Sequence, residues 1–165
     1  MPGIDECLLH AMRLPGARGA ALVDWTSGLA LGTVGDAAGD DHETAAAETA
    51  ELARMAAEHP TFAPVGPAEG RTPVEGRAPV EGRTPVEGRT PVEGRTPVED
   101  RTPVEDRTPV EDLVVTTRTC YHVLRFVETS FDSSVLMHLW LDRAEGNLAL
   151  ARLRMRDLTE RLVLE

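Results

Sequence analysis

The sequence predicts an α/β domain of the α+β type: one five-stranded antiparallel sheet with helices on both faces, in the order α-β-β-α-β-β-β-α. Three observations lead to this fold class. Five short segments alternate apolar residues with period two, and three longer segments have helical apolar spacing. Two of the strand segments are apolar on both sides, as expected when helices cover both faces of a sheet. A block of near-identical hexapeptides interrupts this pattern once.

The hexapeptide block runs from Glu69 to Val110, where the unit Glu-(Gly/Asp)-Arg-(Thr/Ala)-Pro-Val occurs seven times in tandem. Each unit has one Val to bury, which is too little to offset the ordering of its backbone. Its Pro excludes both a helix and a central strand. We therefore predict that 69–110 is a disordered, extended spacer between the second helix and the third strand. The rest of 1–165 is long enough to form a single domain with one core.

The first half of the chain predicts a helix, a hairpin and a second helix. The first helix places four apolar residues on one face and ends at Leu14-Pro15-Gly16; these are Ile4, Leu8, Leu9 and Met12. Strands at 17–25 and 28–34 follow, joined by a Gly-containing turn. Asp40, with Glu43 three residues later, resembles a capping box that opens a helix ending near Glu58. This helix is rich in Ala, so it can approach a neighbour closely.

The second half predicts three strands in a meander and a final helix. The strands are expected at 113–118, 120–128 and 133–142. The segments 17–25 and 133–142 are apolar on both faces and should be central, whereas 113–118 should be an edge. Asn147 can cap the last helix, which extends to about Val163 with one apolar stripe. The stripe consists of Leu148, Ala151, Met155, Leu158 and Leu162.

The charge balance and the N-terminus argue against several classes of partner. Lys+Arg 17 against Asp+Glu 28 gives a net charge of -11, which repels phosphate backbones and anionic membrane surfaces. No apolar run is long enough to insert in a membrane, and the acidic start does not resemble a signal peptide. We expect a cytoplasmic protein with no nucleic acid partner.

Residues capable of chemistry are present, but none occurs in a catalytic or metal-binding pattern. The acidic-His run Asp40–Glu43 is better explained by helix capping than by metal binding. His122 and His138 lie within strands and are expected to be structural. Cys7 resembles a small core residue, and Cys120 near a turn has no paired base. We therefore predict no catalytic residue, no cofactor and no metal, so the chain is not expected to be an enzyme.

Several segments, together with the order of elements, resemble the roadblock (dynein light chain) family, in particular its bacterial members associated with small GTPases. The resemblance covers 1–60 and 111–165 and is carried by Ile4–Leu8, Pro15–Asp24, Gly28–Gly32, Thr44–Glu48 and Asp112–Arg118. It implies a roadblock- or profilin-like sandwich. It also implies a homodimer in which the edge strand pairs with its twin and the middle helix, 41–58, packs alongside the twin's. The insertion directly before the pairing strand departs from the family pattern, and it either hinders dimerisation or forms a loop at the margin of the dimer.

The apolar edge and the Ala-rich helix fit this implied dimer, because an apolar edge needs covering and small residues allow close approach. The residues expected at the interface are Ala46, Ala50, Ala53, Ala57, Leu113, Val114, Val115, Thr116 and Thr117. The family's commonest role implies an adaptor or regulator of a Ras-like small GTPase in a signalling system. The alternative function is a small-molecule-sensing domain, since such folds can hold a ligand pocket. An enzyme using Cys120 or His42 ranks last.

Overall fold

A computed structural model describes residues 3–64, 108–128 and 134–163. Its contacts divide the chain into two compact units, Met1–Ala63 with Arg107–Glu165, and Pro64–Asp106. The first unit is described below. Almost all of the predicted 69–110 insertion lies outside the described residues; only Thr108–Val110 are described, and Val110 packs against a core cluster around Ala53 and Leu124.

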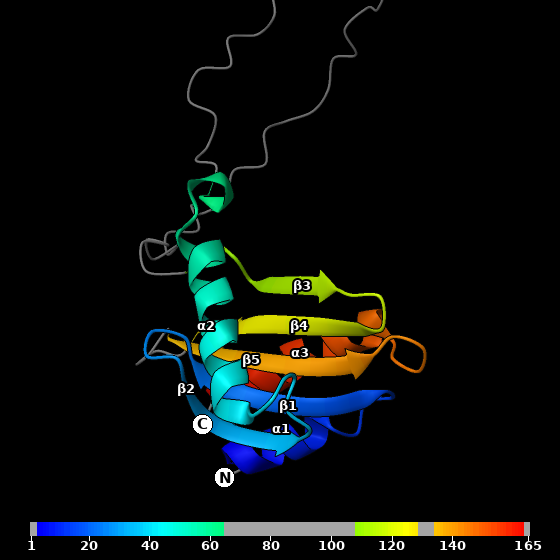
Figure 1. The fold of residues 1–165 in the computed structure, drawn as a ribbon. Helices are drawn as coiled ribbons and strands as arrows, with labels where there is room; N and C mark the ends of the chain where they lie inside the picture. The colour runs from blue at the N-terminus through cyan, green and yellow to red at the C-terminus, as the bar shows by residue number, and fades with distance from the viewer. Residues whose placement is uncertain (1–2, 65–107, 129–133, 164–165) are drawn as a thin grey trace, which may run out of the picture. The chain divides into compact units, whose positions relative to one another are not determined.

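The first unit is a five-stranded antiparallel sheet with helices on both faces, as predicted (Figure 1). The elements are α1 (Ile4–Ala11), β1 (Ala17–Asp24), β2 (Leu29–Gly35), α2 (His42–Glu58), a short 3-10 helix η1 (Pro60–Phe62), β3 (Asp112–Thr116), β4 (Cys120–Val127), β5 (Val135–Asp142) and α3 (Leu148–Val163). The strand order is β2-β1-β5-β4-β3. The two strands predicted to be central, β1 and β5, lie beside each other, and β3 is an edge.

The two faces of the sheet have separate apolar layers. On one face, Leu22, Met137 and Leu139 pack with α1 and α3 in the largest cluster of buried residues. On the other face, α2 crosses the sheet and covers Val23, Leu124 and Leu136 (Figure 1). The alternation within β1 and β5 therefore supplies both layers, which is why these strands are apolar on both sides.

Helix α1 buries only part of the predicted apolar face, in which Leu8 is buried and Met12 packs against the core. The buried side chains are Cys7, Leu8 and Ala11, whereas Leu9 is 54% exposed and Ile4 is also exposed. Helix α1 contacts β1, β2 and α3, and the small residues Cys7 and Ala11 are buried on that side. In α3 the predicted stripe is confirmed: Ala151, Met155 and Leu158 are buried, and Leu148 and Leu162 pack against the same cluster.

Helix α2 begins one residue later than expected. Asp41, and not Asp40, is the N-cap, and its carboxylate accepts a hydrogen bond of 2.8 Å from the Thr44 backbone N–H and another of 2.8 Å from the Thr44 hydroxyl. These bonds lower the pKa of Asp41 below its ordinary value. Thr44 thus takes the position that the predicted capping box assigned to Glu43. None of the helices among the described residues has the length and apolarity needed to span a membrane.

Gly16, in the connection from α1 to β1, is expected to be intolerant of any side chain. Its φ is +74°, and a Cβ there would lie 2.6 Å from the backbone N of Gly146. Gly16→Ala should lower the free energy of unfolding by about 2 kcal/mol, because it combines an unfavourable φ with a clash against backbone. Urea titration measures this, with Gly39→Ala as the control, since a Cβ at Gly39 meets nothing within 4 Å. Equal stability of the two variants would contradict the geometry.

Candidate interaction surface

The edge strand β3 pairs on one side only among the described residues. Its partner is β4, with Leu113 opposite Leu124 and Val115 opposite His122. Leu113 packs beneath α2 and Val114 packs on the opposite face, so both are half-buried at the margin of the core. The strand ends at Thr116, earlier than predicted, because the Thr117 hydroxyl accepts the Cys120 backbone N–H at 2.9 Å and closes the β3–β4 turn.

An ion-pair network fixes the start of β3 against the layer of α1 and α3. Asp112 accepts hydrogen bonds from Arg152 of α3 at 2.9 and 3.1 Å, and its Oδ2 lies 3.5 Å from Nη1 of Arg125 on β4. The Asp112 and Arg125 side chains are largely buried, whereas that of Arg152 is half exposed. Arg125 also donates to the Thr159 hydroxyl of α3 at 3.3 Å. The free edge is therefore held in place although nothing in the described unit covers its outer side.

Removing Asp112 should destabilise the chain more than removing its exposed partner. Asp112→Ala leaves Arg125 largely buried without its carboxylate, and we expect a loss of about 2 kcal/mol in the free energy of unfolding. Arg152→Ala removes the half-exposed partner and should cost under about 1 kcal/mol. Thermal or urea unfolding of the two variants compares them. A larger loss for Arg152→Ala would show that the network is not organised around Asp112.

Helix α2 is longer than the sheet is wide. Its 17 residues span about 25 Å, whereas five strands span about 19 Å from first to last. The helix crosses from β2 towards β3, over the end of the sheet where β3 begins, and continues past that edge together with η1 (Figure 1). We call Met55, Glu58 and η1 the overhang. Met55 is 63% exposed and Phe62 is 52% exposed, so the overhang presents apolar side chains that the described residues do not cover.

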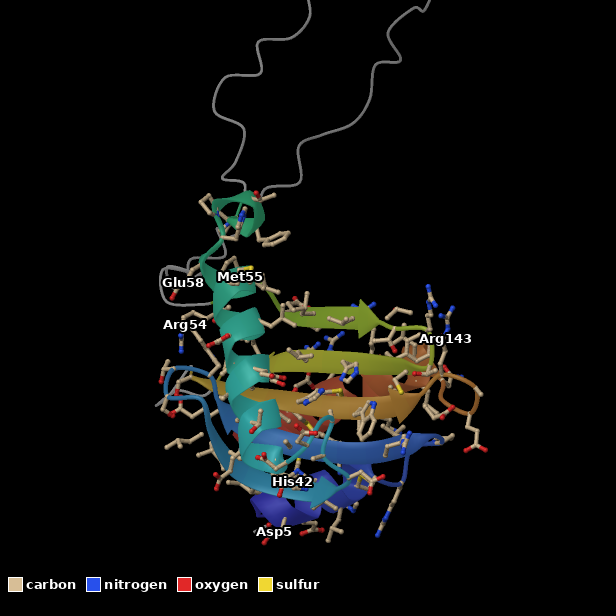
Figure 2. All side chains as sticks on the ribbon, viewed as in Figure 1. Asp5, His42, Arg54, Met55, Glu58 and Arg143 are labelled. Atoms are coloured by element: carbon tan, nitrogen blue, oxygen red, sulfur yellow. The ribbon has the colours of Figure 1, made fainter. Side chains whose placement is uncertain are left out.

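The small residues of α2 have a different use from the one expected. Ala46, Ala50 and Ala53 are buried against the sheet of their own chain, beside Val23 and Leu124. Their size lets α2 lie close to β1 and β5, and no side-chain surface remains for a second copy to contact. Ala57 is half-buried at the edge of the same layer. An interface on this helix must therefore use its exposed side, where Met55 lies (Figure 2).

The end of this sheet face that lies away from α2 carries a row of cationic and aromatic side chains that finishes at an aliphatic one. We call Arg18, Trp140, His122 and Val115, which come from β1, β5, β4 and β3 respectively, the ring row. The Arg18 guanidinium lies 4.6 Å from the centroid of Trp140, and Trp140 stacks on His122 with centroids 6.2 Å apart. Trp140, His122 and Val115 are only half-buried. In Figure 1, α2 does not cross this end of the sheet.

The two strand histidines, both expected to be structural, contact each other. Nδ1 of His122 lies 3.2 Å from Nε2 of His138, and the rings stack with centroids 5.4 Å apart. Burial lowers the pKa of His138 to about 4, with a smaller contribution from His122, and burial also lowers the pKa of His122. The sequence did not reveal this pair, because it depends on the register of β4 against β5, in which His122 is opposite Trp140 and His138 is opposite Leu124.

The remaining candidates do not converge on a site. Among the residues that the structure describes, no group of three or more His, Cys, Asp or Glu could hold a metal ion. Cys7 and Cys120 are both buried, and burial raises the pKa of Cys7 to about 11. His42 lines a hollow of ≈ 20 Å³ together with Asp36, His138 and Trp140. That volume accommodates about one water molecule.

Comparison with known structures decides the fold. The chain resembles Myxococcus xanthus MglB with a TM-score of 0.59 and 12% identity, covering 97% of this chain and 94% of that one. A Roadblock/LC7 domain from Streptomyces avermitilis gives a TM-score of 0.52 and 14% identity, covering 96% and 93%. The chain has the roadblock fold. A structure described as MglB with a tetrameric arrangement is also similar, with a TM-score of 0.58 and 14% identity, covering 96% of this chain and 84% of that one.

Comparison by sequence does not identify the family of this chain. One family model, Cementoin, the trappin protein transglutaminase binding domain, matches residues 73–101. This match falls wholly inside the hexapeptide repeat, which contains neither glutamine nor lysine, and it covers too little of the chain to show its family. No curated protein matches the chain. The roadblock fold predicted from the order of elements is thus confirmed by structure and not by sequence similarity.

Proposed function

We propose that this roadblock-fold chain is a homodimer that binds and regulates a Ras-like small GTPase. The observation that supports the dimer is that two partly uncovered surfaces lie on the same face of the sheet. The overhang leaves Met55 and Phe62 exposed beyond β3, and the far end of the same face leaves the ring row half-covered. The overhang and the Val115 end of the ring row lie beside the free strand edge.

Two-fold symmetry brings these surfaces together. If β3 pairs antiparallel with β3 of a second copy, Asp112 of one chain lies near Thr116 of the other. Each α2 crosses the Asp112 end of its own β3 (Figure 1). The overhang of the second copy then lies over the Thr116 end of the first, where Val115 and His122 are opposite each other in the β3–β4 pair. A contact of this kind is self-complementary, as a two-fold interface requires.

The proposed interface keeps part of the set expected from the sequence. Leu113, Val114, Val115 and Thr116 belong to the pairing strand, and Ala57 lies beside the overhang. Met55 and Phe62 replace the buried Ala46, Ala50 and Ala53 as the contribution of the helical segment. In this arrangement the second copy covers the apolar edge of β3, so the edge is no longer free to pair with other strands.

The partner is proposed from the fold and the family resemblance. The described residues offer little room for the alternative function, a small-molecule sensor, because the hollow beside His42 has a volume of only ≈ 20 Å³ and ligand pockets are usually about 300 Å³ or more.

The GTPase proposal is tested by retention of a Ras-like GTPase on the immobilised full-length chain. We expect binding that depends on whether the GTPase is loaded with GTP or GDP, with a dissociation constant of about micromolar. An unrelated GTP-binding protein is the specificity control. Absence of retention under either nucleotide, at concentrations where the chain is dimeric, would contradict the proposed partner and leave the dimer unaffected.

A further inference from the structure

The His122–His138 pair lies within the surface that the second copy is proposed to cover. His122 is half-buried on β4 and belongs to the ring row, whereas His138 on β5 is buried. The separation of 3.2 Å between Nδ1 of His122 and Nε2 of His138 allows one N–H to be shared between two neutral rings. In this arrangement one ring donates and the other accepts, so adding a proton to the accepting nitrogen breaks the hydrogen bond.

Burial is the main influence that favours the neutral form of the pair. His138 is the titratable neighbour of His122 from β5, and Arg18 of β1 approaches through Trp140. Asp36 is the carboxylate on this side and forms an ion pair of 3.7 Å with Arg18. His42 of α2 lines the same hollow as His138 and Trp140. Burial is the cause of the lowered pKa of His122, with no favourable carboxylate contribution.

We propose that self-association of the chain is coupled to proton binding at the His122–His138 pair, so that acid separates the two copies. This inference rests on the proposed homodimer and adds its regulation. In the overhang of the second copy, the apolar side chains Met55 and Phe62 would cover His122, with the exposed carboxylate of Glu58 directed to solvent. Covering an imidazole with apolar groups disfavours its charged form. By linkage, the charged form of His122 binds the second copy more weakly than the neutral form does.

The sign follows from the direction of the pKa shift. Burial already lowers the pKa of His122 in the single chain, and further burial in the dimer lowers it again. The dimer is therefore most stable at pH values above the pKa that His122 has in the monomer. Its stability decreases as pH falls from there towards the lower pKa of the dimer. Each dimer has two copies of the pair, so the effect is counted twice.

Sedimentation of the full chain at about pH 7.5 and about pH 5.5 tests the coupling. We expect the dissociation constant to rise at least about fivefold at the lower pH. His122→Gln keeps a neutral hydrogen-bonding side chain for His138 but does not titrate, so its dissociation constant should change little. His10→Gln, the same substitution on α1 at the opposite face, should behave like the unmodified chain. Far-UV circular dichroism at both pH values checks that every variant remains folded.

A second measurement keeps the inference testable if His122→Gln fails to fold. The imidazole resonances of His122 are titrated by NMR in the unmodified chain and in Met55→Glu, a variant expected to be monomeric. We expect a higher pKa for His122 in the monomeric variant. Association that is unchanged or stronger in acid would overturn the inference; stronger association would indicate that Glu51 or Glu58 of the second copy pairs with the charged ring. A chain that is monomeric at about pH 7.5 overturns the proposed dimer itself.

Discussion

Met55→Glu is expected to leave the fold of one chain intact and to weaken self-association about 100-fold, or ~3 kcal/mol. Met55 is 63% exposed in the single chain, so a carboxylate there remains hydrated and costs the fold little. In the proposed dimer the same position lies against the ring row of the second copy, where the charge must lose water. Sedimentation of the variant over a range of concentrations measures the effect.

The chain offers a closely matched control for this substitution. Leu153 on α3 is 62% exposed, but it lies on the face of the sheet opposite α2. Leu153→Glu introduces the same charge at an equally exposed apolar position and should leave self-association unchanged. Equal weakening by both variants would mean that net charge, and not the overhang, controls association. An unaffected Met55→Glu dimer would place the interface elsewhere.

Leu139→Ala is expected to produce the largest loss of stability in the chain. Leu139 lies in the central strand β5, is fully buried, and belongs to the cluster between the sheet and the helices α1 and α3. The substitution leaves a cavity and should cost about 3 kcal/mol, a large part of the ~5–15 kcal/mol that stabilises a typical domain. The measurement is best made in the Met55→Glu background, where self-association does not add to the apparent stability.

The control for this loss is Leu29→Ala on the edge strand β2. Leu29 is 65% exposed, and its removal should change the free energy of unfolding by no more than about 0.5 kcal/mol. The contrast between two leucines of the same sheet isolates burial as the cause. Similar losses for both variants would mean that the described core is not the one that stabilises the chain.

The sheet could be predicted from the sequence because its central strands are apolar on both faces. The alternating residues of β1 and β5 have no other stable arrangement than a layer covered from both sides. The weaker patterning of 113–118 correctly identified β3 as an edge. The helices were located well, but their details were not: Asp40 and Asp41 are equally good caps by residue type, and the structure uses Asp41.

The surfaces proposed for self-association were harder to predict, because they depend on distances between elements. An Ala-rich stripe indicates close packing but does not indicate against what, and Ala50 proves to pack on its own sheet. The overhang follows only when the length of α2 is compared with the width of the sheet. The His122–His138 contact depends on a hairpin register that the spacing of the two residues leaves open.

The central claim is that the free edge of β3 and the overhang of α2 form one two-fold interface. Sedimentation equilibrium of the full chain at micromolar concentration and about pH 7.5 tests it most directly. The account predicts a species with twice the mass of the 17.9 kDa chain, lost in Met55→Glu and retained in Leu153→Glu. A chain that sediments with its single mass across the whole concentration range would contradict it.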